Sequence, residues 1–161
     1  MSQHQAIVVL SCGGRKNENW DPPDALLALI TGRTAWEENL PIFAQWEVAM
    51  LLPPNARNLL EFKVEKHRKP SARLDTYEAL AQIKIACDAR KITKISIVAH
   101  PIHQPRVKLV AEKMGFAVTM FDTGYIPLDP ESRWWWVKYE WVFRLYEKFA
   151  AGPIYKYRGW T

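Results

Sequence analysis

Two short runs rich in isoleucine and valine constrain the fold more than any other feature of this sequence. Residues 6–11 (AIVVLS) contain five consecutive apolar residues, and residues 94–99 (KISIVA) end in three, rather than alternating with polar residues throughout as a strand with one solvated face does. Such runs are typical of strands buried on both faces, which belong to parallel sheets covered by helices on both sides. Each run leads into a polar loop and then a helical pattern, the order of a βαβ unit.

The remaining sequence continues this alternation over 161 residues, with no repeat and no linker. We predict an α/β fold, a Rossmann-like three-layer sandwich with a mainly parallel central sheet, in a single domain spanning 1–161. Further strands are expected at 40–45, 59–64 and 116–121. Helices are expected from Pro22 to Ile30 with Gly32 past the end, and at 46–52, 75–90, 105–114 and 131–150.

The start of the chain lacks a basic segment followed by a long apolar run, so neither an export signal nor a transmembrane segment is expected. We therefore predict a cytoplasmic protein. The two cysteines, Cys12 and Cys87, are expected to be thiols rather than a disulfide, and no metal site is expected.

The formal net charge of +5 raises the question of nucleic-acid binding. Residues 56–73 hold six basic side chains against two acidic ones: Arg57, Lys63, Lys66, Arg68, Lys69 and Arg73 against Glu61 and Glu65. We interpret this segment as a solvated basic loop, because no nucleic-acid recognition motif accompanies it. Nucleic acid is the least favoured partner.

The first candidate loop, Cys12-Gly13-Gly14-Arg15-Lys16, directly follows the first buried run. Two glycines allow a ligand close to the backbone, and the amides and basic side chains can face an anion. Gly13, Gly14 and Arg15 are therefore candidate binding residues for a phosphate or carboxylate. A plain Gly-Gly turn explains the pattern equally well, and Cys12 is interpreted as a small buried thiol rather than a nucleophile.

The second candidate loop, residues 100–106 (HPIHQPR), joins the other buried run to a helix that begins near Pro105. His103 then lies near the N-cap and Arg106 in the first turn, where amides and dipole attract anions. Both are candidate catalytic residues, the imidazole as acid or base, and His100 is a candidate ligand-binding residue. The alternative is that His103 only caps the helix while Arg106 pairs with a surface carboxylate.

The third candidate site is the helix start Asp75-Thr76-Tyr77-Glu78. Asp75 and Glu78 fit a capping box, which is a sufficient structural explanation by itself. In a doubly wound sheet this helix start lies beside the other two loops. Asp75 and Thr76 are therefore candidate binding residues for hydroxyl groups or an amine, and Glu78 is a candidate catalytic residue.

The order of these motifs resembles the YdcF/SanA/ElyC-like family, a bacterial domain of unknown function with a Rossmann-like fold. His103-Gln104-Pro105-Arg106 matches the family's His-x-x-Arg, and Asp75-Thr76-Tyr77-Glu78 matches its Asn-Thr-x-Glu. The first glycine loop is shorter here, and Ala44-Gln45-Trp46 stands where relatives have Ser-Gly-Gly. The resemblance implies a small-molecule site, with S-adenosylmethionine or another nucleotide as ligand, and a link to envelope biology in membrane-anchored relatives.

The predicted C-terminal helix is unusually rich in aromatic residues. Residues 131–150 include four tryptophans, and their charged side chains gather on one narrow arc. Such a wide apolar face packs on the sheet and on Tyr155, Tyr157 and Trp160, or serves as a homodimer or membrane interface.

Together these features predict a protein that binds an anionic small molecule, nucleotide-like or phosphorylated, at the carboxyl ends of its strands. If it is an enzyme, a transferase or hydrolase is expected. The alternative is a non-catalytic adaptor that uses its tryptophan-rich helix for protein or membrane-surface contact.

Overall fold

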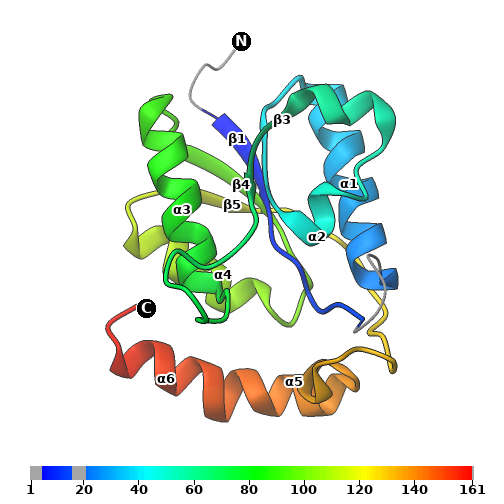
Figure 1. Cartoon of the computed structure of the whole chain (residues 1–161), viewed down its shortest axis with the longest axis vertical. Coiled ribbons are helices and arrows are strands. Elements are labelled where there is room, and N and C mark those ends of the chain that lie inside the picture. Colours follow the sequence, from blue (N-terminus) through cyan, green and yellow to red (C-terminus); the bar gives the residue numbers. More distant parts are fainter. Residues whose placement is uncertain (1–4, 16–20, 161) are drawn as a thin grey trace.

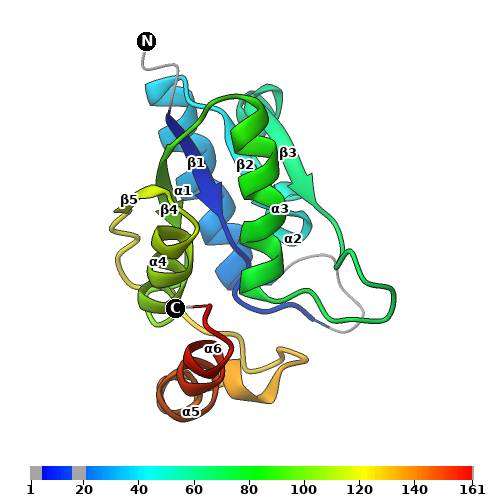
Figure 2. The ribbon, with the colours of Figure 1, turned by 90° about the vertical axis from the view of Figure 1, so that its left-hand side faces the viewer.

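A five-stranded parallel sheet forms the centre of the computed structural model, which describes residues 5–15 and 21–160. Its strand order is β3-β2-β1-β4-β5, and all neighbouring strands are parallel. The strands are β1 (Gln5–Val9), β2 (Ile42–Gln45), β3 (Leu60–Val64), β4 (Lys94–Val98) and β5 (Ala117–Met120). The predicted α/β, Rossmann-like three-layer architecture is confirmed (Figures 1 and 2).

Helices cover both faces of this sheet, which explains why β1 needs apolar residues on both sides. Ala6 and Val8 point into a core with α3 (Thr76–Ala89) and α4 (Gln104–Lys113). Ile7 and Val9 point into a second core with α1 (Pro22–Glu38) and α2 (Trp46–Ala49). Because every side chain of the strand after Gln5 is buried, a one-residue register slip would exchange the contents of the two cores.

The C-terminal segment crosses the carboxyl end of the sheet instead of joining either helical layer (Figures 1 and 2). It consists of the 3-10 turn η2 (Trp135–Val137), α5 (Glu140–Tyr146), the π turn η3 (Glu147–Ala151) and α6 (Gly152–Tyr157). The predicted helix over 131–150 was wrong at both ends, because helical backbone begins at Glu140 and continues to Tyr157. None of the helices in the described ranges has the length and apolar character needed to cross a bilayer.

The π turn explains how this helix passes through Gly152 and Pro153. Proline lacks an N–H, and its ring collides with the carbonyl four residues earlier in a regular α-helix. Here the Gly152 N–H donates to the Glu147 oxygen five residues back, which widens the helix before Pro153. A Cβ at position 152 would lie 2.8 Å from that oxygen, so glycine is required there.

Gly32, predicted to lie past the end of its helix, is inside α1. The helix ends instead at Asn39, which takes the left-handed conformation with φ of 51°. A Cβ on Gly32 would lie 2.6 Å from Pro53 Cδ and 3.1 Å from Ala56 Cβ. The glycine is thus explained by close packing of α1 on the 3-10 turn η1 (Pro54–Leu59).

We expect Gly32→Ala to destabilise the protein by about 1 to 3 kcal/mol through overpacking. The sign opposes helix propensity, which by itself favours alanine over glycine by about 1 kcal/mol. Urea denaturation measures the change. The control is Arg33→Ala on the exposed face of the same helix, expected to change stability by less than about 0.5 kcal/mol. A stabilised Gly32→Ala would contradict the packing argument.

Candidate functional site

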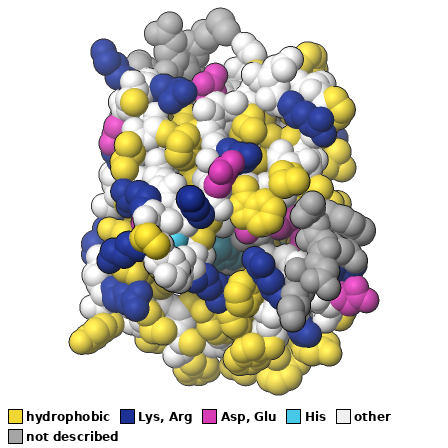
Figure 3. Space-filling model, viewed as in Figure 1, with side chains coloured by type: hydrophobic (Ala, Val, Ile, Leu, Met, Phe, Trp, Pro, Cys, Tyr) yellow, Lys and Arg dark blue, Asp and Glu magenta, His cyan; other side chains and the backbone are white. Residues whose placement is uncertain are grey.

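A pocket of about 540 Å³ lies at the carboxyl ends of β1 to β4. One wall consists of the loops that follow the strands and the start of α3, and the other comes from residues 133–158 of the C-terminal segment. Figure 3 shows basic side chains around this hollow. Of the predicted site residues, Gly13, Asp75, Thr76, His103 and Arg106 line it.

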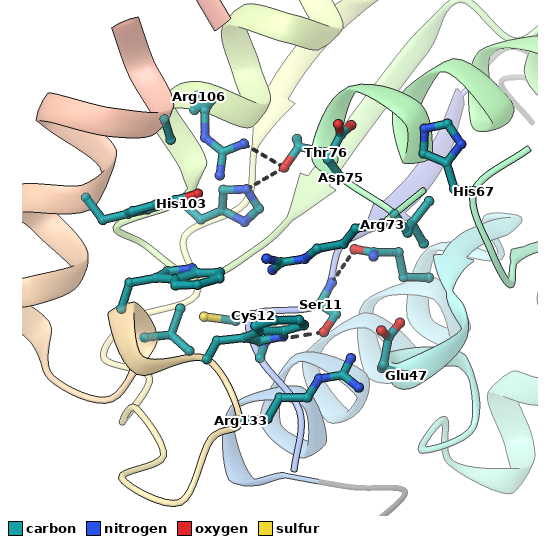
Figure 4. Close-up of a pocket in the computed structure, with 18 of the residues that line it drawn as sticks. Ser11, Cys12, Glu47, His67, Arg73, Asp75, Thr76, His103, Arg106 and Arg133 are labelled. Carbon is teal, nitrogen blue, oxygen red and sulfur yellow. Dashed lines mark hydrogen bonds between the residues drawn. The ribbon is translucent and has the colours of Figure 1, made fainter. Parts of the chain in front are cut away.

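A hydrogen-bonded chain joins the two walls. The Arg106 Nη1 donates to Thr76 Oγ1 over 2.8 Å, and the same oxygen lies 3.0 Å from His103 Nε2 (Figure 4). Arg106 also forms a bidentate pair with Glu147, with N–O distances of 2.7 and 2.8 Å. His103 occupies the N-cap position of α4, but its side chain does not cap that helix and turns instead toward α3.

Burial affects the protonation of the two titratable side chains in this hydrogen-bonded network, His103 and Arg106. It lowers the pKa of His103 well below its ordinary value, and the neighbouring Arg106 charge lowers it further, so the ring is neutral at neutral pH. A neutral imidazole can accept a proton, which is the chemistry predicted for it. Burial by itself would lower the pKa of Arg106, but the hydrogen bonds and charge of Glu147 outweigh it and raise that pKa.

The prediction that Arg106 faces an anion needs correction for this reason. Its guanidinium is matched by Glu147, and both side chains are only 12% exposed. Arg106 therefore pairs with a carboxylate, as in the alternative interpretation, but that carboxylate is largely buried rather than at the surface. The sequence did not indicate the partner, because Glu147 is 41 residues away on the C-terminal segment.

Replacing Glu147 by glutamine is expected to destabilise the protein by about 3 to 5 kcal/mol, because it leaves a largely buried guanidinium without its counter-charge. Thermal or urea unfolding measures the loss. Glu140→Gln is the matched control on the same segment, since its exposed partner Arg144 makes that pair worth less than about 0.5 kcal/mol. Equal effects of the two substitutions would contradict the special role of Glu147.

The glycine loop after β1 is held by protein side chains rather than left open for an anion. The Cys12 N–H donates to Asp24 Oδ1 over 2.9 Å, and the Ser11 N–H donates to Gln45 Oε1 over 2.9 Å. The Ser11 hydroxyl donates to Asp24 Oδ2 over 2.7 Å. Within the predicted loop, the Cys12 amide is therefore used by Asp24 and the Gly13 amide donates to Ser11 Oγ over 3.4 Å, although Gly13 still lines the pocket.

Of the other members of this loop, Cys12 lines the pocket, Gly14 and Arg15 do not, and Lys16 lies outside the described residues. Arg15 pairs with Asp129 over 2.6 Å and with Glu131 over 3.0 Å, so its charge is used within the protein. Cys12 is a buried free thiol whose pKa is raised by burial and by Asp24, which agrees with the structural interpretation.

Asp24 anchors this loop from the first turn of α1, and its ionisation is unusual. Burial, followed by the charge of Asp21, raises the pKa of Asp24 to about 7. In an unfolded chain an aspartate titrates near 3.9, so the folded protein holds this proton more tightly. Protonated Asp24 therefore makes its full contribution to the free energy of unfolding below about pH 4, and this contribution is lost as the pH rises toward 7.

We expect the free energy of unfolding to fall on the order of 3 kcal/mol between pH 4 and 7 through this group. Asp24→Asn should remove that slope, because an amide does not titrate. Urea titrations across this pH range measure it, with the exposed Asp122→Asn as the control that retains the slope. An unchanged slope in Asp24→Asn would contradict the assignment.

Glu78 and His100 do not line the main pocket. The Glu78 carboxylate accepts from Arg68 Nε over 2.7 Å and from Gln82, and the Arg68 hydrogen bonds lower its pKa to about 2. Asp75 caps α3 as predicted, but the reciprocal half of the capping box is replaced by this pair. His100 lines a second cavity of about 310 Å³, where Nε2 lies 3.0 Å from the Ile126 oxygen.

Two pocket arginines were not predicted as site residues. The guanidinium carbon of Arg73 lies 3.5 Å from the ring centroid of Trp134, and that of Arg133 lies 4.8 Å from the same centroid. Neither forms an ion pair with a carboxylate of the described residues, and each guanidinium reaches into the pocket (Figure 4). Burial, and less strongly the Arg133 charge, lowers the pKa of Arg73. Only a tertiary structure brings the basic loop and the aromatic segment together.

Glu47, at the start of α2, also lines the pocket. Its Oε2 is buried without a hydrogen-bond partner within the described part of the chain. Burial raises the pKa of this carboxyl, and the charge of Arg133 partly offsets the rise. No group of three or more metal-ligating side chains suited to an ion occurs within residues 5–15 and 21–160.

The chain matches no protein-family model, and no curated protein and no solved structure is significantly similar to it. The resemblance to YdcF-like proteins therefore rests on the quoted motifs. The fold and the pocket chemistry provide the basis for a functional proposal.

Proposed function

We propose that this protein binds a small anionic molecule, phosphorylated or nucleotide-like, between Arg73 and Arg133. The observation that carries the proposal is the position of two guanidinium groups against one indole ring, at a pocket, with no carboxylate partner in the described residues. The charge of Arg133 disfavours the charged form of Arg73, and an anion bound at the two guanidinium groups offsets this repulsion.

The size and position of the pocket support the same proposal. About 540 Å³ falls within the range of about 300 to 1,000 Å³ common for small-molecule sites. Ligands of open α/β sheets bind beyond the carboxyl ends of the strands, where this pocket lies. Guanidinium groups suit phosphate because they bind its oxygens in a bidentate manner.

The charge of the site favours a phosphorylated ligand over S-adenosylmethionine, which carries a sulfonium cation. Glu47 and Asp75 line the same pocket and can accept hydrogen bonds from hydroxyl groups of the ligand. A phosphate ester with free hydroxyl groups satisfies both parts of the site. His103, neutral and in the same pocket, is the group suited to accept a proton if the ligand is turned over.

A panel of inorganic phosphate, sugar phosphates, nucleotides and S-adenosylmethionine tests the proposal by thermal shift and calorimetry. A ligand at 100 times its dissociation constant stabilises the protein by about 2.7 kcal/mol. We expect Arg73→Gln and Arg133→Gln each to weaken binding of the selected phosphate ester about 10- to 100-fold, the loss of a charged hydrogen bond. Rising salt should weaken binding as well.

The control is Arg33→Gln, an exposed arginine on α1 that pairs with Glu37 far from the pocket lining. It should bind as the parent protein does. Unchanged affinity in both pocket variants, or selective binding of S-adenosylmethionine alone, would contradict the proposal.

A further inference from the structure

The C-terminal segment has an outer apolar stripe that the fold leaves uncovered. Trp141, Leu145 and Phe149 follow one another at intervals of four residues and are 67%, 46% and 65% exposed. In an α-helix, four residues slightly overshoot one turn, so a stripe with this spacing drifts around the axis. The π turn η3 contains Phe149 and, being wider, offsets the drift between Leu145 and Phe149.

The inner face of the same segment is fully used by the fold. Phe143 and Tyr155 are buried against the two cores, and Tyr146 stacks on Trp136 at 5.0 Å. With the inner face fixed in this way, the stripe must point outward. Figure 3 shows hydrophobic side chains gathered along the lower edge of the molecule, where Figure 1 places α5 and α6.

The charges around the stripe are unbalanced. Between residues 138 and 158 both acidic side chains are already paired, Glu140 with Arg144 and Glu147 with Arg106. Four cations of this stretch have no carboxylate within ion-pair distance among the described residues: Lys138, Lys148, Lys156 and Arg158. Arg158 lines the main pocket and Lys138 lines the second cavity. Lys148 lies beside the stripe, with its Nζ 5.2 Å from the ring centroid of Phe149, and adds positive charge there that no carboxylate of the described residues neutralises.

We propose that this outer face docks on an anionic lipid surface, with the helical segment lying parallel to the plane of the membrane. Tryptophan, phenylalanine and leucine on one face, with Lys148 beside them, match the composition of interfacial helices. The flanking cations gain from negatively charged headgroups. A second copy of the chain docked on the same face would bring the two sets of cations together, which disfavours self-association.

Flotation of the full chain with vesicles tests the proposal. We expect binding to vesicles of equal parts phosphatidylcholine and phosphatidylglycerol, and little to phosphatidylcholine alone. Trp141→Ser combined with Phe149→Ser should abolish flotation, and Lys148→Gln should weaken it about fivefold. The matched control is Trp36→Ser, which removes a 59% exposed tryptophan from α1 and should leave flotation unchanged.

Several results would overturn the proposal. One is parent protein that does not float with anionic vesicles; another is a Trp141/Phe149 variant that floats as well as the parent. A parent dimer in light scattering that the double substitution dissociates would assign the stripe to a second copy. Because both substituted side chains are exposed, the double variant should unfold at the parent temperature, and a large loss of stability would contradict the outward placement.

Discussion

The ion pair between Arg106 and Glu147 holds the C-terminal segment over the carboxyl edge of the sheet. One partner belongs to the first turn of α4 and the other to the π turn, so the pair joins the α/β layers to the segment that crosses them. Arg106 also donates to Thr76, which contacts His103. The second wall of the pocket depends on this attachment, and the outward direction of the aromatic stripe depends on it together with the burial of Phe143 and Tyr155.

Because Arg106 is paired within the protein, our proposal assigns anion binding to other cations. Arg73 and Arg133 are held by the face of Trp134, a contact that orients a guanidinium without neutralising it. Amides at the start of the glycine loop are likewise used within the protein, because Asp24 accepts a hydrogen bond from the Cys12 N–H and Gln45 accepts one from the Ser11 N–H. The pocket lies at the end of the sheet where the sequence predicted a site, and the arginines without an ion-pair partner among the described residues that line it, Arg73 and Arg133, were not among the predicted residues.

The sequence predicted strands well where the hydrophobic pattern follows directly from burial. The runs around β1 and β4 must be apolar on both faces, so their positions and parallel pairing could be inferred. Gly32 was wrongly predicted to lie past the end of its helix, because the glycine is required by the contact of α1 with Pro53. The last helix was predicted to end at residue 150, because the sequence does not indicate the π turn that carries the backbone through Gly152. Local propensity gives no information about either contact.

The sequence by itself determined the α/β architecture and the edge of the sheet at which polar loops collect, because hydrophobic periodicity and chain order are local properties. Only the tertiary structure decided which charges remain available for a ligand. Glu147 neutralises Arg106 and Glu78 binds Arg68 through pairings between separate elements, whereas Arg73 and Arg133 meet at one tryptophan. Charge compensation depends on distance in space, which the spacing of residues along a chain does not specify.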